Sequence, residues 1–343
     1  MMKSRFRILV ILFLSVSFVY AQNAERTEKL SRTFEVNGRI LKVINSFGDI
    51  ELRNWNKDQI FIEIEITAKA NTDDKVTRLL NKIDIDIEEN SSSIHYETNL
   101  KGLASKNRES FKIKYTIHLP STVDVVLKQS FGDIIIDSRL GSSDIEVSYG
   151  NLKATDFESL DLKLSFGAGV MTSAVNAEIE VSYSNFSIEK IKQLKMVEKF
   201  SEVEINEVDM LDMRANYGDI SLQQVSIADI DAQFTGLNIG ALTKSLVLKA
   251  NYVSGFEIRE VSAGFELIDI SSKFSELELH LGDGLKAIFE GEFSFANLKD
   301  YAGIDYSFRL KDHNDSEYRG SINGGDSTKK ITVESSYGDL TLK

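Results

Sequence analysis

A short pattern returns through most of this chain and constrains its fold more than any other feature. An aromatic residue follows a small or polar one and is itself followed by a small residue, then Asp, Asn or Glu, then an apolar residue. Its clearest copies are Ser46–Ile50, Ser130–Ile134, Ser148–Leu152, Asn216–Ile220 and Ser336–Leu340. Weaker copies centre on Phe166, Tyr183, Phe200, Phe234, Tyr252, Phe274 and Phe295. From Phe131 to Tyr252 the steps are 17 or 18 residues, which indicates one stacked structural unit.

Apolar residues alternate on both sides of each aromatic residue. They lie four and six positions before it, as Leu162 and Leu160 do, and three and five positions after it, as Ile220 and Leu222 do. Spacing by two is typical of a strand with one buried face. Each unit of about 17 residues is therefore predicted to be strand, bend and strand. Because one unit cannot bury its apolar face alone, we expect an all-β fold, a parallel β-solenoid.

The bend has a structural interpretation. Glycine tolerates a positive φ there, and Asp or Asn bonds to nearby backbone N–H groups. Some copies replace the glycine, so a positive φ is not strictly required at that position; the replacements are Ser184, Ser201, Thr235 and Ser275. A calcium-binding nonapeptide ladder would need denser Gly and Asp. The recurrent Phe and Tyr side chains are predicted to form a ladder in the core.

The aromatic residues alternate between Phe and Tyr along the regular stretch. One unit per coil would stack each Phe on a Tyr, whereas two units per coil would give separate Phe and Tyr columns. We expect the second arrangement. It predicts that Phe166 contacts Phe131 and Phe200. Contacts with Tyr149 and Tyr183 would contradict it.

Residues 1–21 have the layout of a secretory signal peptide. Basic residues at Lys3, Arg5 and Arg7 precede an apolar run, and cleavage is expected after Ala21. The alternative is an N-terminal membrane anchor, but the apolar run is short for a bilayer span. Residues 22–38 are predicted to be a polar, mobile lead-in, residues 39–120 a β-rich cap or flanking segment with the first repeat copy at 46–50, and residues 121–343 the solenoid.

The predicted cap carries its own patterns. Alternation from Ile60 to Ile66 predicts a long strand, and Thr72 can cap a short helix with Asp73 and Asp74 in its first turn. Its buried face would hold Val76, Leu79, Leu80 and Ile83. Two further strands follow, the second ending at Pro120, the only proline. Near the other end, Lys311–Lys330 is predicted to be a surface loop.

Composition excludes several kinds of site. The 343 residues include no cysteine, so the chain has no disulfide, zinc-thiolate site or thiol nucleophile. A formal charge of -13, with 53 acidic and 40 basic side chains, argues against nucleic acid as a partner. No stretch beyond the signal peptide is long and apolar enough for a transmembrane segment.

No residues are predicted to be catalytic, cofactor-binding or metal-binding. The four histidines, His95, His118, His280 and His313, are scattered without ligand or nucleophile–base spacing. Asp84 and Asp86 alternate with isoleucines and are interpreted as the solvated side of a strand. The positions expected to face solvent after the bend are chemically mixed and form no aromatic strip for sugars; they are Glu51, Lys153, Ser187, Glu204, Ser221, Asn238 and Glu278.

A family resemblance rests on four features of the sequence: the signal peptide, the strand ending in Leu119–Pro120, the Ser-Phe/Tyr-Gly-Asp-Ile units and the final Ser-Tyr-Gly-Asp-Leu at 336–340. The chain resembles the putative adhesin proteins of Bacteroidetes, which are similar to auto-transporter adhesin head domains. The resemblance implies an exported β-solenoid of unassigned function. It brings no ligand, cofactor or catalytic residue with it.

These patterns favour a non-catalytic, adhesin-like protein of the cell envelope that binds a protein or glycan partner. It is expected in the periplasm, on the outer surface or in the medium. One alternative is a periplasmic accessory of a membrane or signalling complex. A polysaccharide-active enzyme is a further alternative, because β-helices also host lyases and hydrolases.

Overall fold

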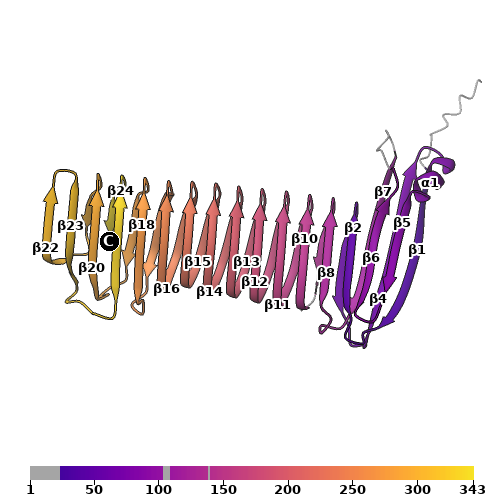
Figure 1. Ribbon diagram of the computed structural model, residues 1–343, viewed down its shortest axis with the longest axis horizontal. Coiled ribbons are helices and arrows are strands. Elements are labelled where there is room, and N and C mark those ends of the chain that lie inside the picture. Colours follow the sequence, from indigo (N-terminus) through magenta and orange to yellow (C-terminus); the bar gives the residue numbers. More distant parts are fainter. Residues whose placement is uncertain (1–23, 103–108, 138–139) are drawn as a thin grey trace, which may run out of the picture.

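The computed structural model describes residues 24–102, 109–137 and 140–343, and within them the chain forms a long rod of stacked strands (Figure 1). All the strands belong to one hydrogen-bonded network. The expected fold class is confirmed: it is a parallel β-solenoid of about nine turns with a β-rich N-terminal region and one helix. The predicted signal peptide at residues 1–21 lies outside the described residues.

The regular part of the rod consists of long strands that each run from one turn to the next. Each strand pairs in parallel with the next strand at an offset of 17 or 18 residues, so that Leu162, Ile179 and Met196 form one column. These strands are β10 (Leu140–Ser148), β11 (Asn151–Ser165), β12 (Ala168–Ser182), β13 (Asn185–Lys199), β14 (Glu202–Asn216), β15 (Asp219–Gln233) and β16 (Gly236–Asn251).

One unit makes one coil. Phe166 stacks on Tyr149 at 4.8 Å and on Tyr183 at 5.1 Å between ring centroids, so the expectation of two units per coil is wrong. Parallel pairing needs only the same apolar columns and backbone hydrogen bonds in successive units. Phe and Tyr rings have nearly the same shape, so their alternation does not prevent stacking of every unit on the next.

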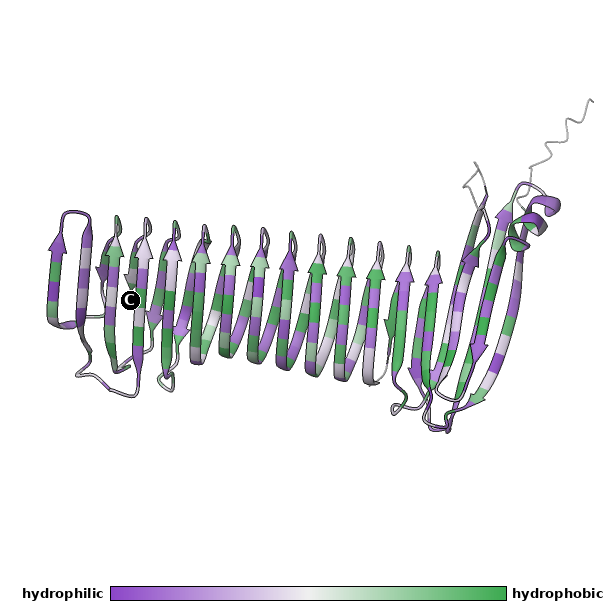
Figure 2. Cartoon of the chain, in the orientation of Figure 1, coloured by the Kyte–Doolittle hydropathy of each residue, from purple (hydrophilic) through white to green (hydrophobic). Residues whose placement is uncertain are grey.

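The core lies between the two arms of each coil. Apolar and polar side chains alternate along the strands, as Figure 2 shows, and the inward columns are buried; Leu162, Ile179 and Val208 are at most 1% exposed. A stack of such coils buries a continuous core that no single coil could form. The solenoid therefore presents two long side faces and two edges to solvent.

The N-terminal segment closes one end of the rod. β1 (Ala24–Glu35) pairs antiparallel with β4 (Gln59–Ala70), which pairs with β7 (Ser110–Leu119). The mobile lead-in predicted at 22–38 is therefore wrong for residues 24–35, because backbone pairing holds this polar sequence against β4. The remaining strands here are β2 (Ile40–Ser46), β3 (Ile50–Asn54), β5 (Ile83–Glu89), β6 (Ser93–Leu100), β8 (Val125–Ser130) and β9 (Ile134–Ile136).

The predicted short helix is confirmed as α1 (Asp73–Leu80). Its buried residues Val76, Leu79 and Leu80 pack in a small cluster with Ala68 and Ala70 of β4. Thr72 stands at the N-cap, but its side chain makes no capping hydrogen bond. Ile83, predicted for the buried face of the helix, begins β5 instead and is half-buried.

A buried polar network joins the cap to the solenoid. The Asn45 amide donates to the carbonyl of Ile113 at 3.2 Å and to the Gln129 side chain at 3.0 Å. Thr98 donates to Asn45 at 2.9 Å, and Gln129 donates to the carbonyl of Gly48 at 2.6 Å. Buried polar groups cost free energy unless they are paired, so these bonds favour a single register of the first coil against the cap.

The C-terminal repeat copy is inserted out of chain order. β24 (Lys330–Ser336) lies between β18 (Leu267–Lys273) and β20 (Ala287–Ser294). β25 (Leu340–Leu342) likewise lies between β19 (Leu277–Leu281) and β21 (Leu298–Asp300). β17 (Ser254–Val261) pairs with β16 and β19. The last part of the sequence is thus enclosed by earlier segments.

The surface loop predicted at 311–330 is wrong for most of its length. β22 (Asp305–Asp312) and β23 (Asp315–Ile322) form an antiparallel hairpin that extends the sheet beyond β20. Seven of the eight residues of β22 are exposed, although Tyr306, Phe308 and Leu310 alternate with polar residues along it. A strand held chiefly by backbone pairing needs no apolar face of its own. Its charged side chains also protect an edge strand from further pairing.

Candidate binding surfaces

Twelve aromatic side chains form a continuous external stack along one edge of the solenoid, which we name the aromatic ridge. Neighbouring ring centroids are 4.7–5.1 Å apart and the planes differ by 1–10°. Each side chain is 41–54% exposed, so the predicted core ladder is wrong. In spatial order the ridge contains Phe47, Phe131, Tyr149, Phe166, Tyr183, Phe200, Tyr217, Phe234, Tyr252, Phe274, Tyr337 and Phe295.

Backbone geometry explains why these rings lie outside. At every turn it is the aromatic residue that adopts a positive φ, between 51° and 62°. The glycine that follows is needed for a different reason, because a Cβ on Gly150 would lie 1.9 Å from the carbonyl oxygen of Gly132. The left-handed conformation costs an L-residue roughly 1–2 kcal/mol. Stacking on two neighbours, at about 0.5–1.5 kcal/mol for each pair, offsets that cost.

The turns without glycine use a hydroxyl instead. Ser184 Oγ accepts a hydrogen bond from the N–H of Gly167 at 3.1 Å and donates to the carbonyl of Ser182 at 2.8 Å. Ser201 makes the equivalent pair of bonds one coil later. The loss of glycine in these copies is thus accompanied by side-chain bonds that satisfy the turn backbone.

Near the C-terminal end, Phe and Tyr alternate in space although they do not alternate in the sequence. Tyr337 stacks between Phe274 and Phe295 at 4.8 and 4.9 Å, although it follows both in the chain. The ring faces are covered by neighbouring rings, so the ridge presents mainly ring edges and tyrosine hydroxyls to solvent. Sugar rings stack on aromatic faces, and the interior of the ridge leaves no free face for them.

A buried carboxyl group lies beneath the ridge. Glu198 is 0% exposed and accepts hydrogen bonds from the N–H of Ser201 at 2.6 Å and of Asn216 at 3.0 Å. Burial raises its pKa to about 7, against the opposing effect of the two N–H donors. A carboxyl whose pKa is higher in the folded than in the unfolded chain stabilises the fold least when it is ionised.

The free energy of unfolding should therefore carry a pH dependence from Glu198. This contribution is fully present below the unfolded pKa of 4.5 and is lost as pH rises through the folded value of about 7. Glu198→Gln has no carboxyl group to ionise and does not lose this contribution. The free energy of unfolding of the variant, relative to that of the wild type, should therefore rise by on the order of 1–2 kcal/mol from pH 4.5 to pH 8. Chemical denaturation at the two pH values measures this, with the exposed Glu204→Gln as control. An equal difference between Glu198→Gln and wild type at both pH values would contradict it.

A long open groove crosses one side face of the solenoid, and we name it the acidic groove. Its volume is about 870 Å³, and it extends over the outward side of the arms that precede the turns, from β8 to β16. Between its two walls lies the backbone of an inward-facing column whose side chains belong to the core and are at most 9% exposed: Leu160, Ala177, Leu194, Leu211 and Ala228. One wall carries Ser142, Ser159, Asn176, Gln193, Met210 and Ile227.

The other wall of the acidic groove is a row of carboxylates on successive coils. In-register pairing aligns Asp144, Asp161, Glu178, Lys195, Asp212 and Asp229. The single lysine of the row bonds to Glu178 at 2.8 Å. Burial raises the pKa of Asp161, and the nearby carboxylate of Asp144 raises it further. Repeated pairing at one strand spacing thus concentrates negative charge along this wall.

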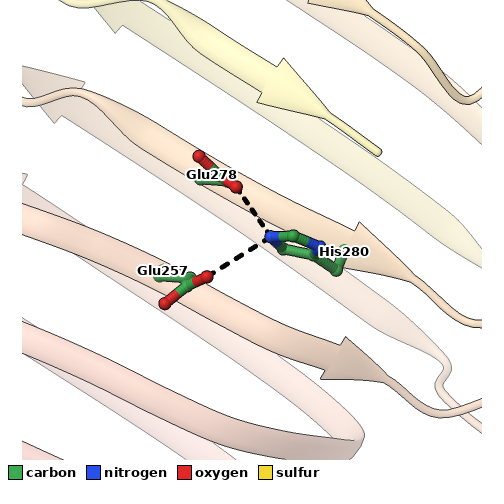
Figure 3. Close-up of side chains that lie close together, drawn as sticks. All are labelled: Glu257, Glu278 and His280. Atoms are coloured by element: carbon green, nitrogen blue, oxygen red, sulfur yellow. Dashed lines mark hydrogen bonds and ion pairs between the residues drawn. The ribbon is translucent and has the colours of Figure 1, made fainter.

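A third cluster lies towards the C-terminal end, where Glu257 of β17 and Glu278 and His280 of β19 converge (Figure 3). His280 Nε2 lies 2.7 Å from a Glu278 oxygen and 3.3 Å from a Glu257 oxygen. Two carboxylates and an imidazole are a possible ligand set for a divalent cation. Lys343 also bonds to Glu278, and Arg259 Nε lies 3.5 Å from Glu257. These cations already neutralise the two carboxylates.

The sequence did not predict this cluster because the register shifts there. Counted from the aromatic residue, Glu257 is five positions on and Glu278 four, yet they pair directly. The shift lies between Gly236 and Asn238 of β16, opposite Gly255 with its φ of 62°. A bulge moves one strand by one residue. Two local signals were present in the sequence: Gly255 at the bulge, and Glu278 and His280 two residues apart on one strand.

The other residues considered from the sequence have structural surroundings. Asp84 forms an ion pair with Lys101 at 2.8 Å, and Asp86 accepts from Asn99 at 2.6 Å, as expected for the solvated side of a strand. The other histidines lie apart: His95 near Glu88 and Glu97, His118 against Trp55, and His313 beside Asp312. The mixed positions expected to face solvent after the bend are half-buried or exposed.

No protein-family model matches this chain, and no curated protein does. Solved structures similar to it include a putative adhesin from Parabacteroides distasonis, with 13% identity and a TM-score of 0.41 over 74% of this chain and 97% of that one. A putative adhesin from Parabacteroides merdae has 11% identity and a TM-score of 0.41 over 92% and 96%. A putative cell adhesion protein from Clostridium sporogenes has 12% identity and a TM-score of 0.21 over 93% and 99%.

These structures carry the description that the sequence resemblance implied. At such identities and TM-scores the similarity says nothing about what this chain binds. Among the residues that the structure describes, no helix is both long and apolar enough to cross a membrane.

Proposed function

We propose that this chain is a non-catalytic, exported, adhesin-like scaffold of the cell envelope that binds a protein or glycan partner along its side face. The observation that supports this most is the acidic groove, which offers a continuous surface over successive coils of an otherwise regular rod. Stacked coils are suited to extended partners, because one contact can recur at every repeat. The N-terminal pattern of residues 1–21 supports export.

The proposal is tested with the protein expressed from its full sequence, using a glycan array and a pull-down from envelope extracts. We expect one partner class to be retained by the wild type and lost by Asn176→Trp, whose large side chain would fill the groove from an exposed position. Val170→Trp, at an exposed position outside the groove, is the matched control. Equal retention by all three proteins would show that the groove is not the binding surface.

A polysaccharide-active enzyme is the second candidate, and one observation favours it. Carboxylates on neighbouring strands in a long groove are the residues that glycoside hydrolysis uses, and a raised carboxyl pKa such as that of Asp161 suits a general acid. Turnover of any polysaccharide that is lost in Asp161→Asn would favour this candidate over a binding scaffold. A membrane protein recovered in the pull-down would instead favour an accessory of an envelope complex.

A further inference from the structure

The row of carboxylates in the acidic groove narrows the chemistry of the partner. Six acidic residues and one lysine line the groove, and that lysine is already bonded to Glu178. Asp144, Asp161 and Asp212 have no salt bridge within 4 Å among the described residues. Lys128, Lys163 and Lys195 lie near these three carboxylates and interact with them without forming an ion pair. The six acidic side chains of the groove therefore keep an excess of negative charge over its one lysine.

The opposite wall restricts the partner further. Met210 and Ile227, both about 40% exposed, give that wall an apolar end. No aromatic side chain lines the groove, so it lacks the faces on which neutral sugars stack. An anionic glycan would be repelled by the carboxylates. Lysine and arginine combine an aliphatic stem with a cationic head, which matches exposed apolar side chains opposite an acidic wall.

We propose that the acidic groove binds an extended, lysine- or arginine-rich segment of a partner protein. The segment lies along the solenoid axis, with its cationic heads at Asp144, Asp161 and Asp212 and with aliphatic stems against Met210 and Ile227 at one end of the groove. This proposal rests on the proposed binding function and specifies its partner. Because carboxylates recur on most coils of the row, with Lys195 as the one exception, contacts add along the groove and the register of the bound segment can vary.

The test compares two triple variants that change the net charge equally. Asp144→Asn/Asp161→Asn/Asp212→Asn removes charge from the groove and leaves the Lys195–Glu178 pair intact. Glu202→Gln/Glu204→Gln/Glu260→Gln removes three exposed carboxylates from the other arm of the coils. The probe is a labelled peptide of alternating lysine and threonine, with a glutamate–threonine peptide as control, and binding is followed by fluorescence anisotropy at low and at physiological salt.

We expect the lysine peptide to bind the wild type and the control triple within about twofold of each other, and the groove triple roughly tenfold more weakly. Asn176→Trp should weaken binding without any change in charge, which separates the groove from a diffuse electrostatic effect. Equal weakening by both triples, or no binding of the lysine peptide, would overturn the proposal. A neutral glycan retained in the array and unaffected by the groove triple would overturn it too, while leaving the proposed binding function in place.

Discussion

Gly150→Ala should destabilise the solenoid strongly, because the turn leaves no room for an added methyl group. The new Cβ would lie 1.9 Å from the carbonyl oxygen and 2.7 Å from the carbonyl carbon of Gly132. The turn cannot move away freely, because Tyr149 N–H is bonded to the carbonyl of Ser165 and the preceding coil bonds to Ser148. We expect a loss of about 3 kcal/mol in the free energy of unfolding.

The matched control is Gly264→Ala. There the nearest atom to an added Cβ is the carbonyl oxygen of Thr243 at 3.8 Å, and the backbone is not in the left-handed region. This variant should remain within about 0.5 kcal/mol of wild type. Denaturant unfolding followed by circular dichroism measures both. If Gly150→Ala is no less stable than Gly264→Ala, the turn relaxes into an arrangement like that at Ser184, and close approach is not what selects glycine.

Tyr183→Ala should have the second largest effect. The substitution removes stacking on Phe166 at 5.1 Å and on Phe200 at 4.9 Å, and it leaves alanine at a φ of 51°. Two lost aromatic pairs predict a destabilisation of roughly 1–3 kcal/mol. The measurement is again the free energy of unfolding.

Two further substitutions at the same position separate stacking from backbone strain. Tyr183→Phe keeps both ring contacts and should stay within about 0.5 kcal/mol of wild type. Tyr183→Gly loses the contacts but relieves the left-handed conformation, so it should be less destabilised than Tyr183→Ala by about 1 kcal/mol. A glycine variant as stable as wild type would mean that the aromatic ridge does not stabilise the coils, and that its exposure must be explained by binding alone.

The two surfaces have different physical roles in this account. The aromatic ridge contributes mainly to stability, because its ring faces are used by neighbouring rings and only the edges are left for a partner. The acidic groove costs stability, because like charges on successive coils repel one another. A feature that lowers the free energy of unfolding and makes no stabilising contact of its own is the better candidate for function.

Local patterns in the sequence were enough for the regular part of the fold. The period of 17 or 18 residues, the alternation of Leu160 and Leu162, and a short helix after Thr72 were predicted correctly, although Ile83 was wrongly placed on that helix. Each depends on neighbours within one unit, since the periodicity of apolar residues follows from the backbone geometry of a strand or a helix. No site residue was predicted, because the same local patterns do not show that Glu257 and Glu278 lie side by side.

The sequence alone therefore determined the repeating strand, the bend and the side of each strand that is buried. Only the tertiary structure decided that one unit makes one coil, that the aromatic residue rather than glycine takes the positive φ, and that Tyr337 enters between Phe274 and Phe295. These outcomes depend on contacts between residues at least 17 positions apart in the chain. The acidic groove has the same origin, because carboxylates separated by one repeat become neighbours only when the coils stack in register.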